Sequence, residues 1–206
     1  MPLTTPQVEA ALRRWADCLD AAAPELNRLD AQLGDGDLGA TLQKCAARVR
    51  TALDAGPYAN LGLLFNACAQ GCARASGSSF GTLLTVAFMT LARRLENQTT
   101  LAPHDVPPLL QASLDAMSQR GGATLGDKTV LDTLAAAHDA IAGLDEPRAQ
   151  HAAASAAVDE TITSFRMRPN RIGRARMFAE RSVGLDDPGM IAFRHMLAGI
   201  APVDGG

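Results

Sequence analysis

The sequence predicts an all-α protein. Apolar residues recur every three or four positions in most long segments, which is the spacing of one helix face. We find no series of alternating β-branched runs separated by hairpin turns. Glycine-rich polar segments lie between the apolar stretches, at positions 30–39, 71–81, 121–129 and 170–189. We therefore expect about eight helices in a barrel or bundle, with these segments gathered at one end to form a single site.

The first helix is marked by an apolar stripe from Val8 to Leu19, with the Thr5-Pro6 pair as a candidate N-cap and first-turn proline. Pro24 is expected to interrupt this helix, because an internal proline removes a backbone hydrogen bond. The chain from Leu26 to Asp30 would then form a separate short helix that leads into the first glycine-rich segment.

Later segments show the same periodicity. An apolar face runs from Leu61 to Cys72. The segment from Phe80 to Leu95 is apolar almost all round, which predicts a central buried helix. The remaining helices are expected at 107–119, 129–143, 147–167 and 188–200.

Composition is that of a globular chain, with 47% hydrophobic and 20% charged residues among 206. This length supports one sizeable core, and no change in composition divides the chain, so we expect a single domain over residues 1–206. A formal charge of -3 gives no support for binding nucleic acid or an anionic membrane.

The N-terminus has neither a basic start nor an apolar stretch, so no signal peptide is predicted. The longest apolar run, Leu83 to Ala92, is about half of the roughly 20 residues that a membrane span requires. We expect no membrane span and a cytoplasmic protein. Cys68 and Cys72 continue an apolar stripe, which predicts small reduced core side chains rather than a metal pair.

Three aspartates form the most informative motif. Asp30, Asp35 and Asp37 fall within eight positions, with Gly34 and Gly36 beside two of them. Close carboxylates repel one another unless a positive charge lies between them. Oxygen ligands without Cys or His indicate Mg²⁺ or Ca²⁺. A solvated acidic turn is the alternative on these residues alone, whereas the spacing and terminal Glu of an EF-hand loop are missing.

A second motif, Ala75 to Thr82, opens the most apolar helix with serines and glycines. The N-terminus of a helix offers free N–H groups and the positive end of the helix dipole, which suits phosphate. Ordinary serine capping explains the same residues.

A third motif, Gly121 to Thr129, nearly matches a P-loop. Asp127 intrudes between Gly126 and Lys128, however, and no strand precedes the motif. A P-loop requires a strand, a loop and a helix in that order. We therefore reject a P-loop nucleotide-hydrolase, while a glycine-rich loop that leads into a helix is still expected.

The fourth motif spans Gly173 to Gly189 and carries Arg174, followed by an Asp187-Pro188-Gly189 turn before the last helix. Arginine forms charge-assisted bonds with phosphate. A surface loop with solvated charges is the alternative for this segment alone.

Together and in this order, the four motifs resemble the Dak2 domain family, the nucleotide-binding L subunits of dihydroxyacetone kinases. The resemblance covers about residues 5–200. It implies an eight-helix antiparallel barrel with ATP or ADP at one end and two Mg²⁺ ions between the phosphates and Asp30, Asp35 and Asp37. It also implies a catalytic role for Arg174. The implied nucleotide contacts are Leu38, Gly39, Ala40, Thr41, Ala75, Ser76, Gly121, Val130, Arg174, Asp187, Pro188 and Gly189.

The chain departs from the family pattern at some of these positions. Leu38 stands where the family usually has His, Thr41 where Asn is common, and Arg176 begins a stretch that is usually Ser-Tyr-Leu-Gly. The metal aspartates are all present, so the resemblance implies an intact fold and metal site.

The resemblance implies one half of a two-component dihydroxyacetone (glycerone) kinase. A separate K-type subunit would hold the small hydroxyketone, and a phosphotransferase-system protein would rephosphorylate bound ADP in some systems. Two alternatives stay open: a kinase for a related sugar such as a tetrulose, and a nucleotide-sensing module without catalysis.

Overall fold

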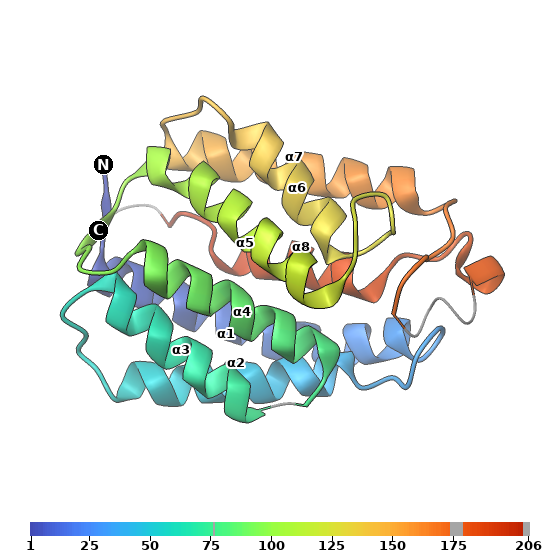
Figure 1. Cartoon of the computed structure of the whole chain (residues 1–206), viewed down its shortest axis with the longest axis horizontal. Coiled ribbons are helices and arrows are strands. Elements are labelled where there is room, and N and C mark those ends of the chain that lie inside the picture. The colour runs from blue at the N-terminus through green and yellow to red at the C-terminus, as the bar shows by residue number, and fades with distance from the viewer. Residues whose placement is uncertain (76, 174–178, 204–206) are drawn as a thin grey trace.

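The computed structural model describes residues 1–75, 77–173 and 179–203, and over these residues the chain forms eight α-helices (Figure 1). A short 3-10 helix, Pro103–Asp105, precedes α5, and two-residue strands β1 (Leu3–Thr4) and β2 (Thr100–Leu101) pair antiparallel. The α-helices are α1 (Thr5–Asp30), α2 (Leu38–Asp54), α3 (Leu61–Ala75), α4 (Ser79–Arg94), α5 (Val106–Gly121), α6 (Val130–Ile141), α7 (Pro147–Phe165) and α8 (Pro188–Gly199).

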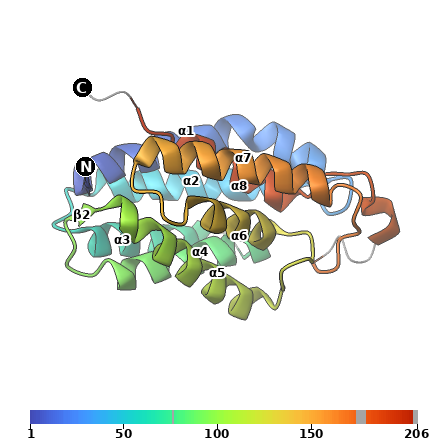
Figure 2. The same cartoon turned by 90° about the horizontal axis from the view of Figure 1, so that it is seen from above.

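The helices form a closed antiparallel ring. Each helix packs against the next along the chain, and α8 returns to pack against α1 (Figures 1 and 2). Short connections between consecutive helices favour this up-and-down order. The even-numbered helices therefore all begin at the same end of the barrel. The helical architecture confirms the predicted all-α class. None of the described helices is long and apolar enough to cross a membrane.

The prediction that Pro24 interrupts the first helix is wrong, because α1 continues from Thr5 to Asp30. Pro24 is exposed, while Ala22, Ala23 and Leu26 on the opposite side are buried. The carbonyl group that loses its partner to a proline can therefore bond to water. The helix starts one residue earlier than predicted, with Thr4 as the N-cap.

Helix α2 was not predicted as a separate element. It carries a buried stripe of Leu42, Cys45, Val49 and Leu53 that follows the helical period. The expected total of eight helices is therefore correct for a different reason: α2 was missed, and α1 was divided into two.

The expectation that the segment around Phe80–Leu95 is buried all round is also wrong. In α4 only Gly81, Leu84 and Phe88 are buried, and Met89 is 40% exposed. In a ring of helices each helix turns one face toward the core. Phe88 lies on that face, where it packs edge-on against Trp15 with ring centroids 5.7 Å apart.

The cysteines behave as predicted. Cys45, Cys68 and Cys72 are buried, and all four cysteines of the chain are free. Burial raises the pKa of the Cys68 thiol to about 12. These side chains pack as small apolar groups in the barrel core.

Candidate functional site

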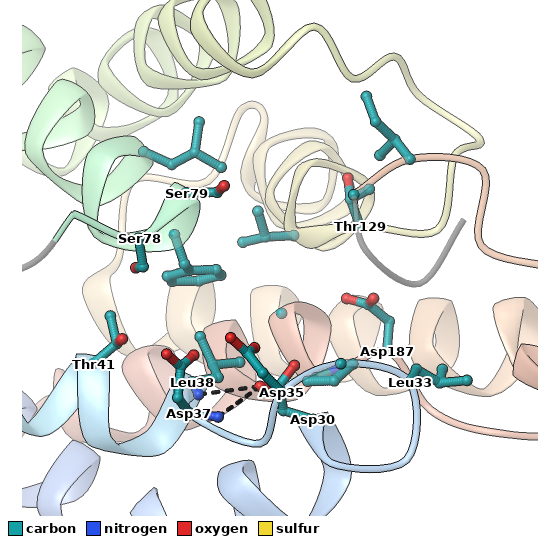
Figure 3. Close-up of a pocket in the computed structure, with 18 of the residues that line it drawn as sticks. Asp30, Leu33, Asp35, Asp37, Leu38, Thr41, Ser78, Ser79, Thr129 and Asp187 are labelled. Atoms are coloured by element: carbon teal, nitrogen blue, oxygen red, sulfur yellow. Dashed lines mark hydrogen bonds between the residues drawn. The ribbon is translucent and has the colours of Figure 1, made fainter. Parts of the chain in front are cut away.

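A cavity of about 590 Å³ opens at the end of the barrel where the even-numbered helices begin (Figure 3). Its wall combines the acidic loop after α1, the end of α3, the starts of α2, α4, α6 and α8, and residues 172–173 before α8. The glycine-rich segments 30–39, 71–81 and 170–189 supply much of this wall. The segment 121–129 reaches it at Thr129. A volume of this size is typical of a small-molecule or cofactor site.

The last turn of α1 fixes the acidic loop. The Asp30 carboxylate accepts hydrogen bonds at Oδ2 from the backbone N–H groups of Asp37, at 2.9 Å, and Leu38, at 3.2 Å (Figure 3). Asn27, one turn earlier, accepts the N–H of Ala40 at 3.1 Å. Two side chains of α1 thus satisfy amides at the start of α2, which otherwise have no partner within that helix.

Glycine is required within this loop. A Cβ atom on Gly34 would lie 2.7 Å from Oδ1 of Asp30, and Gly36 has a φ of +74°. These two positions let the chain curl back so that the three carboxylates meet. Oxygen atoms of Asp30, Asp35 and Asp37 lie within 4.8 Å of one another.

The donor set fits a hard divalent cation. Three carboxylate oxygens without nitrogen or sulfur ligands are typical of Mg²⁺ or Ca²⁺ sites. Asp37 occupies the N-cap position of α2, yet its side chain makes no capping hydrogen bond. Its carboxylate therefore takes no part in closing the helix, although Asp is a favoured capping residue.

Three helix starts, which suit an anion, also line the cavity. The starts of α4, α6 and α8 are capped by the side chains of Ser78, Thr129 and Asp187, which accept backbone N–H groups at about 3 Å. Each helix start contributes the positive end of a helix dipole. Figure 3 shows Ser78, Ser79 and Thr129 across the cavity from the aspartates. The three aspartates on one side and the starts of α4 and α6 on the other provide binding groups for a metal–phosphate complex.

The cavity also has an apolar part. Phe80 and Leu83 of α4, Val130 of α6, Ile172 and Pro188 contribute to its lining. An apolar wall beside polar groups is the usual composition of a site for a ring-bearing ligand. The arrangement therefore suits a ligand with both a flat ring and phosphates.

Asp187, at the start of α8, links the cavity lining to the chain around it. Its Oδ1 atom accepts the N–H of Met190 at 2.9 Å, and its Oδ2 atom accepts the Asn170 amide at 2.8 Å. Burial raises the pKa of the Asp187 carboxyl to about 6, and the hydrogen bonds and the nearby Lys128 charge oppose that shift.

Many of the predicted site residues meet in this cavity. The three aspartates line it together with the predicted nucleotide contacts Leu38, Thr41, Ala75, Val130, Asp187, Pro188 and Gly189. Ser76 and Arg174 lie outside the described residues. The ligand roles of all these residues stay predictions.

Three predicted contacts lie apart from the lining. Gly39 and Ala40 lie against α1: a Cβ atom on Gly39 would overlap the carbonyl oxygen of Ala23, and the N–H of Ala40 bonds to Asn27. Gly121 ends α5, and its Cα lies beside Leu83, which does line the cavity.

The sequence interpretation missed several lining residues, among them Lys44 and Ile172. Lys44 lies three residues after Thr41 and six after Leu38, which places all three near one face of α2. Prediction of α2 as a helix would have found it. Ile172 reaches the cavity through the irregular chain before α8, for which no periodicity gives a signal.

The fold and the site define a single helical barrel with an acidic, phosphate-suited cavity at one end. The DAK2 domain family model matches residues 32–202 of the chain. The chain therefore belongs to the DAK2 domain family, which confirms the resemblance found in the sequence.

Two curated relatives differ in how much of their length this chain covers. The D-erythrulose kinase of Mycolicibacterium smegmatis is 34% identical over 189 residues, which cover 88% of this chain and 32% of that protein. The ADP-binding subunit DhaL of the PEP-dependent dihydroxyacetone kinase of Escherichia coli is 25% identical over 206 residues, which cover 98% of each chain. The chain thus spans about a third of the erythrulose kinase and nearly all of the DhaL subunit.

A solved structure shares the fold. The dihydroxyacetone kinase of C. freundii, crystallised with AMP-PNP and Mg²⁺, superposes with a TM-score of 0.76 at 25% identity. The match covers 98% of this chain and 34% of that one. This likeness confirms the predicted eight-helix barrel.

Proposed function

We propose that this chain is the nucleotide-binding component of a kinase that phosphorylates a small hydroxyketone. The observation that carries the proposal is one cavity whose lining combines three carboxylates within 4.8 Å of one another with the starts of α4, α6 and α8. Phosphoryl transfer depends mainly on positioning and on neutralising charge, and this arrangement provides both kinds of group.

In this proposal Asp30, Asp35 and Asp37 hold Mg²⁺, as two ions in the arrangement that the family resemblance implies. The metal, when bound, neutralises phosphate charge. The helix starts at Ser78 and Thr129 orient phosphate oxygens through backbone N–H groups. The apolar wall keeps water from the ring of the nucleotide base. The predicted catalytic role of Arg174 is part of the proposal.

The acceptor would be held by a separate K-type subunit or domain. The C. freundii enzyme and the erythrulose kinase extend well beyond the part that this chain matches, which supports such a division of labour. Dihydroxyacetone is the first acceptor to test. Erythrulose is the second, because the erythrulose kinase has the higher identity of the two relatives described above.

The test combines the purified chain with ATP, Mg²⁺ and each sugar, with and without the K-type subunit of a dihydroxyacetone kinase. Sugar phosphate, measured by phosphorus NMR, should form only when both proteins are present. Strong phosphorylation by the chain alone would contradict the two-component proposal. Nucleotide binding without turnover, whatever the partner and sugar, would favour the sensing module.

The phosphoryl source is tested separately. A subunit that is recharged in place by a phosphotransferase-system protein should retain ADP through gel filtration. A subunit that exchanges ATP freely should lose it. The E. coli relative is a subunit of a PEP-dependent kinase, so the ADP-retaining version is tested first.

A further inference from the structure

Lys128 is the basic residue of the motif that nearly matches a P-loop, but it does not line the cavity. Its side chain is almost completely buried, with 1% of the residue exposed. Its φ is +63°, in the left-handed region that residues with a side chain rarely adopt. The side chain therefore needs another role than the phosphate contact of a P-loop lysine.

Within the described part of the chain, the ammonium group of Lys128 bonds to backbone carbonyl groups. Its Nζ atom donates to the carbonyl oxygens of Arg166 at 3.1 Å, Arg168 at 2.8 Å and Ser182 at 2.9 Å. An ammonium has three N–H donors, so this set uses all of them. Burial lowers the pKa of the Lys128 ammonium, and the carboxylates of Asp187 and Asp186 oppose that shift.

The three carbonyl groups belong to the connection between α7 and α8, of which residues 166–173 and 179–187 are described. Lys128 holds both the first part of this connection, through Arg166 and Arg168, and the second part, through Ser182. Two backbone bonds accompany it: Arg171 donates to the carbonyl of Asp127 at 3.1 Å, and Gly184 donates to that of Arg166 at 2.9 Å.

The same connection forms part of the cavity wall. Ile172, Gly173 and Asp187 line the cavity. Asn170 joins the two features, since its side-chain amide donates to the carbonyl of Lys128 at 2.9 Å and to Asp187 at 2.8 Å. One buried cation thus bonds to both described parts of this connection.

We propose that Lys128 is a positioning residue: it holds the described parts of the α7–α8 connection, residues 166–173 and 179–187, against the start of α6. The wall that carries Ile172, Gly173 and Asp187 is then in place before nucleotide binds. The nucleotide part of this proposal rests on the proposed function, whereas the positioning of the connection does not.

The test compares Lys128→Met, which keeps the length of the side chain but has no donors, with Leu53→Ala. Leu53 is 2% exposed at the far end of α2, so its truncation destabilises the fold without reaching the cavity. Hydrogen exchange at the amides of Arg171 and Gly184 is measured, together with the Kd for ADP in excess Mg²⁺, well below the melting temperature of either variant.

Lys128→Met should lose at least tenfold protection at both amides, with protection in α1–α3 unchanged, and should raise the Kd for Mg²⁺–ADP at least tenfold. Leu53→Ala should lower the melting temperature but keep the wild-type Kd. Wild-type exchange in Lys128→Met, or an equal rise in Kd in Leu53→Ala, would overturn the proposal.

If Lys128→Met does not fold, Lys128→Arg takes its place. Arginine keeps the charge, but its planar guanidinium cannot direct three N–H groups to the same carbonyl oxygens, so the same changes are expected and wild-type values overturn the proposal. If wild type binds no Mg²⁺–ADP at all, the proposed function fails, while the exchange measurement still decides the role of Lys128.

Discussion

Replacing Asp35 by Asn removes one of the three facing carboxylates. Asp35 is exposed, and Asn has nearly the same size and shape as Asp. The Asp35→Asn change therefore tests the charge of the cluster. Without metal, we expect the variant to be at least as stable as wild type, because the remaining carboxylates repel each other less.

The size of this effect follows from the geometry. Two unit charges 4.8 Å apart repel by about 1 kcal/mol in water, and Asp35 faces two such neighbours. Because 4.8 Å is the greatest separation among these oxygen atoms, removing Asp35 relieves about 2 kcal/mol before salt screening. For a chain of this length, each kcal/mol raises the melting temperature by about 2–4 °C.

Mg²⁺–ADP should act in the opposite direction, because it stabilises wild type more than the variant. Mg²⁺–ADP at about 100 to 1,000 times its Kd stabilises wild type by about 2.7–4.1 kcal/mol. Each tenfold loss of affinity in Asp35→Asn removes about 1.4 kcal/mol of that gain. The variant should therefore melt higher than wild type without ligand and respond much less to Mg²⁺–ADP.

The assay is thermal unfolding of both proteins with and without Mg²⁺–ADP. Asp159→Asn, an exposed change of the same charge on α7, serves as the matched control and should keep the wild-type ligand response. If Asp35→Asn shows the same ligand-induced shift as wild type, the acidic loop is a solvated turn and the metal assignment is wrong.

Three further predictions concern Asp187, Gly39 and Leu38. Because burial raises the folded-state pKa of Asp187 from 3.8 to about 6, its charge costs stability in full above pH 6, and this cost shrinks as the pH falls from 6 toward 3.8. The melting temperature of Asp187→Asn relative to wild type should therefore rise between pH 5 and 7.5, and a constant difference would contradict this. Gly39→Ala should lower the free energy of unfolding by about 1–3 kcal/mol in a urea titration, since the new Cβ atom meets the α1 backbone. Gly77→Ala should change the free energy of unfolding by no more than about 0.5 kcal/mol, because a Cβ atom added there has nothing within 4 Å. Similar losses in both variants would refute the packing argument. Leu38→His restores the usual family residue and should leave Mg²⁺ binding intact with equal or tighter nucleotide binding by calorimetry, whereas a loss of Mg²⁺ binding would show that Leu38 is needed for the site.

The fold class was predictable because helical periodicity is local. The error at Pro24 arose because a proline interrupts a helix only where its surroundings cannot satisfy the freed carbonyl, and exposure is a tertiary property. The omission of α2 was avoidable, since Leu42, Cys45, Val49 and Leu53 follow the helical period in the sequence itself.

The acidic cluster was predictable for the same reason, because its three aspartates are close in sequence. The placement of Lys128 was not, since its backbone acceptors lie 38 to 54 residues further along the chain. A motif that resembles a P-loop predicts phosphate binding, and only the packing of the α7–α8 connection shows that this lysine bonds to carbonyl groups instead.

The central claim is that the three aspartates bind nucleotide through a divalent metal. Calorimetric titration of the purified chain with ADP, once in Mg²⁺ and once in EDTA, tests it most directly. We expect saturable binding in Mg²⁺ and at least a tenfold weaker association in EDTA. Equal affinity under both conditions would contradict it, because the carboxylates would then take no part in holding the nucleotide.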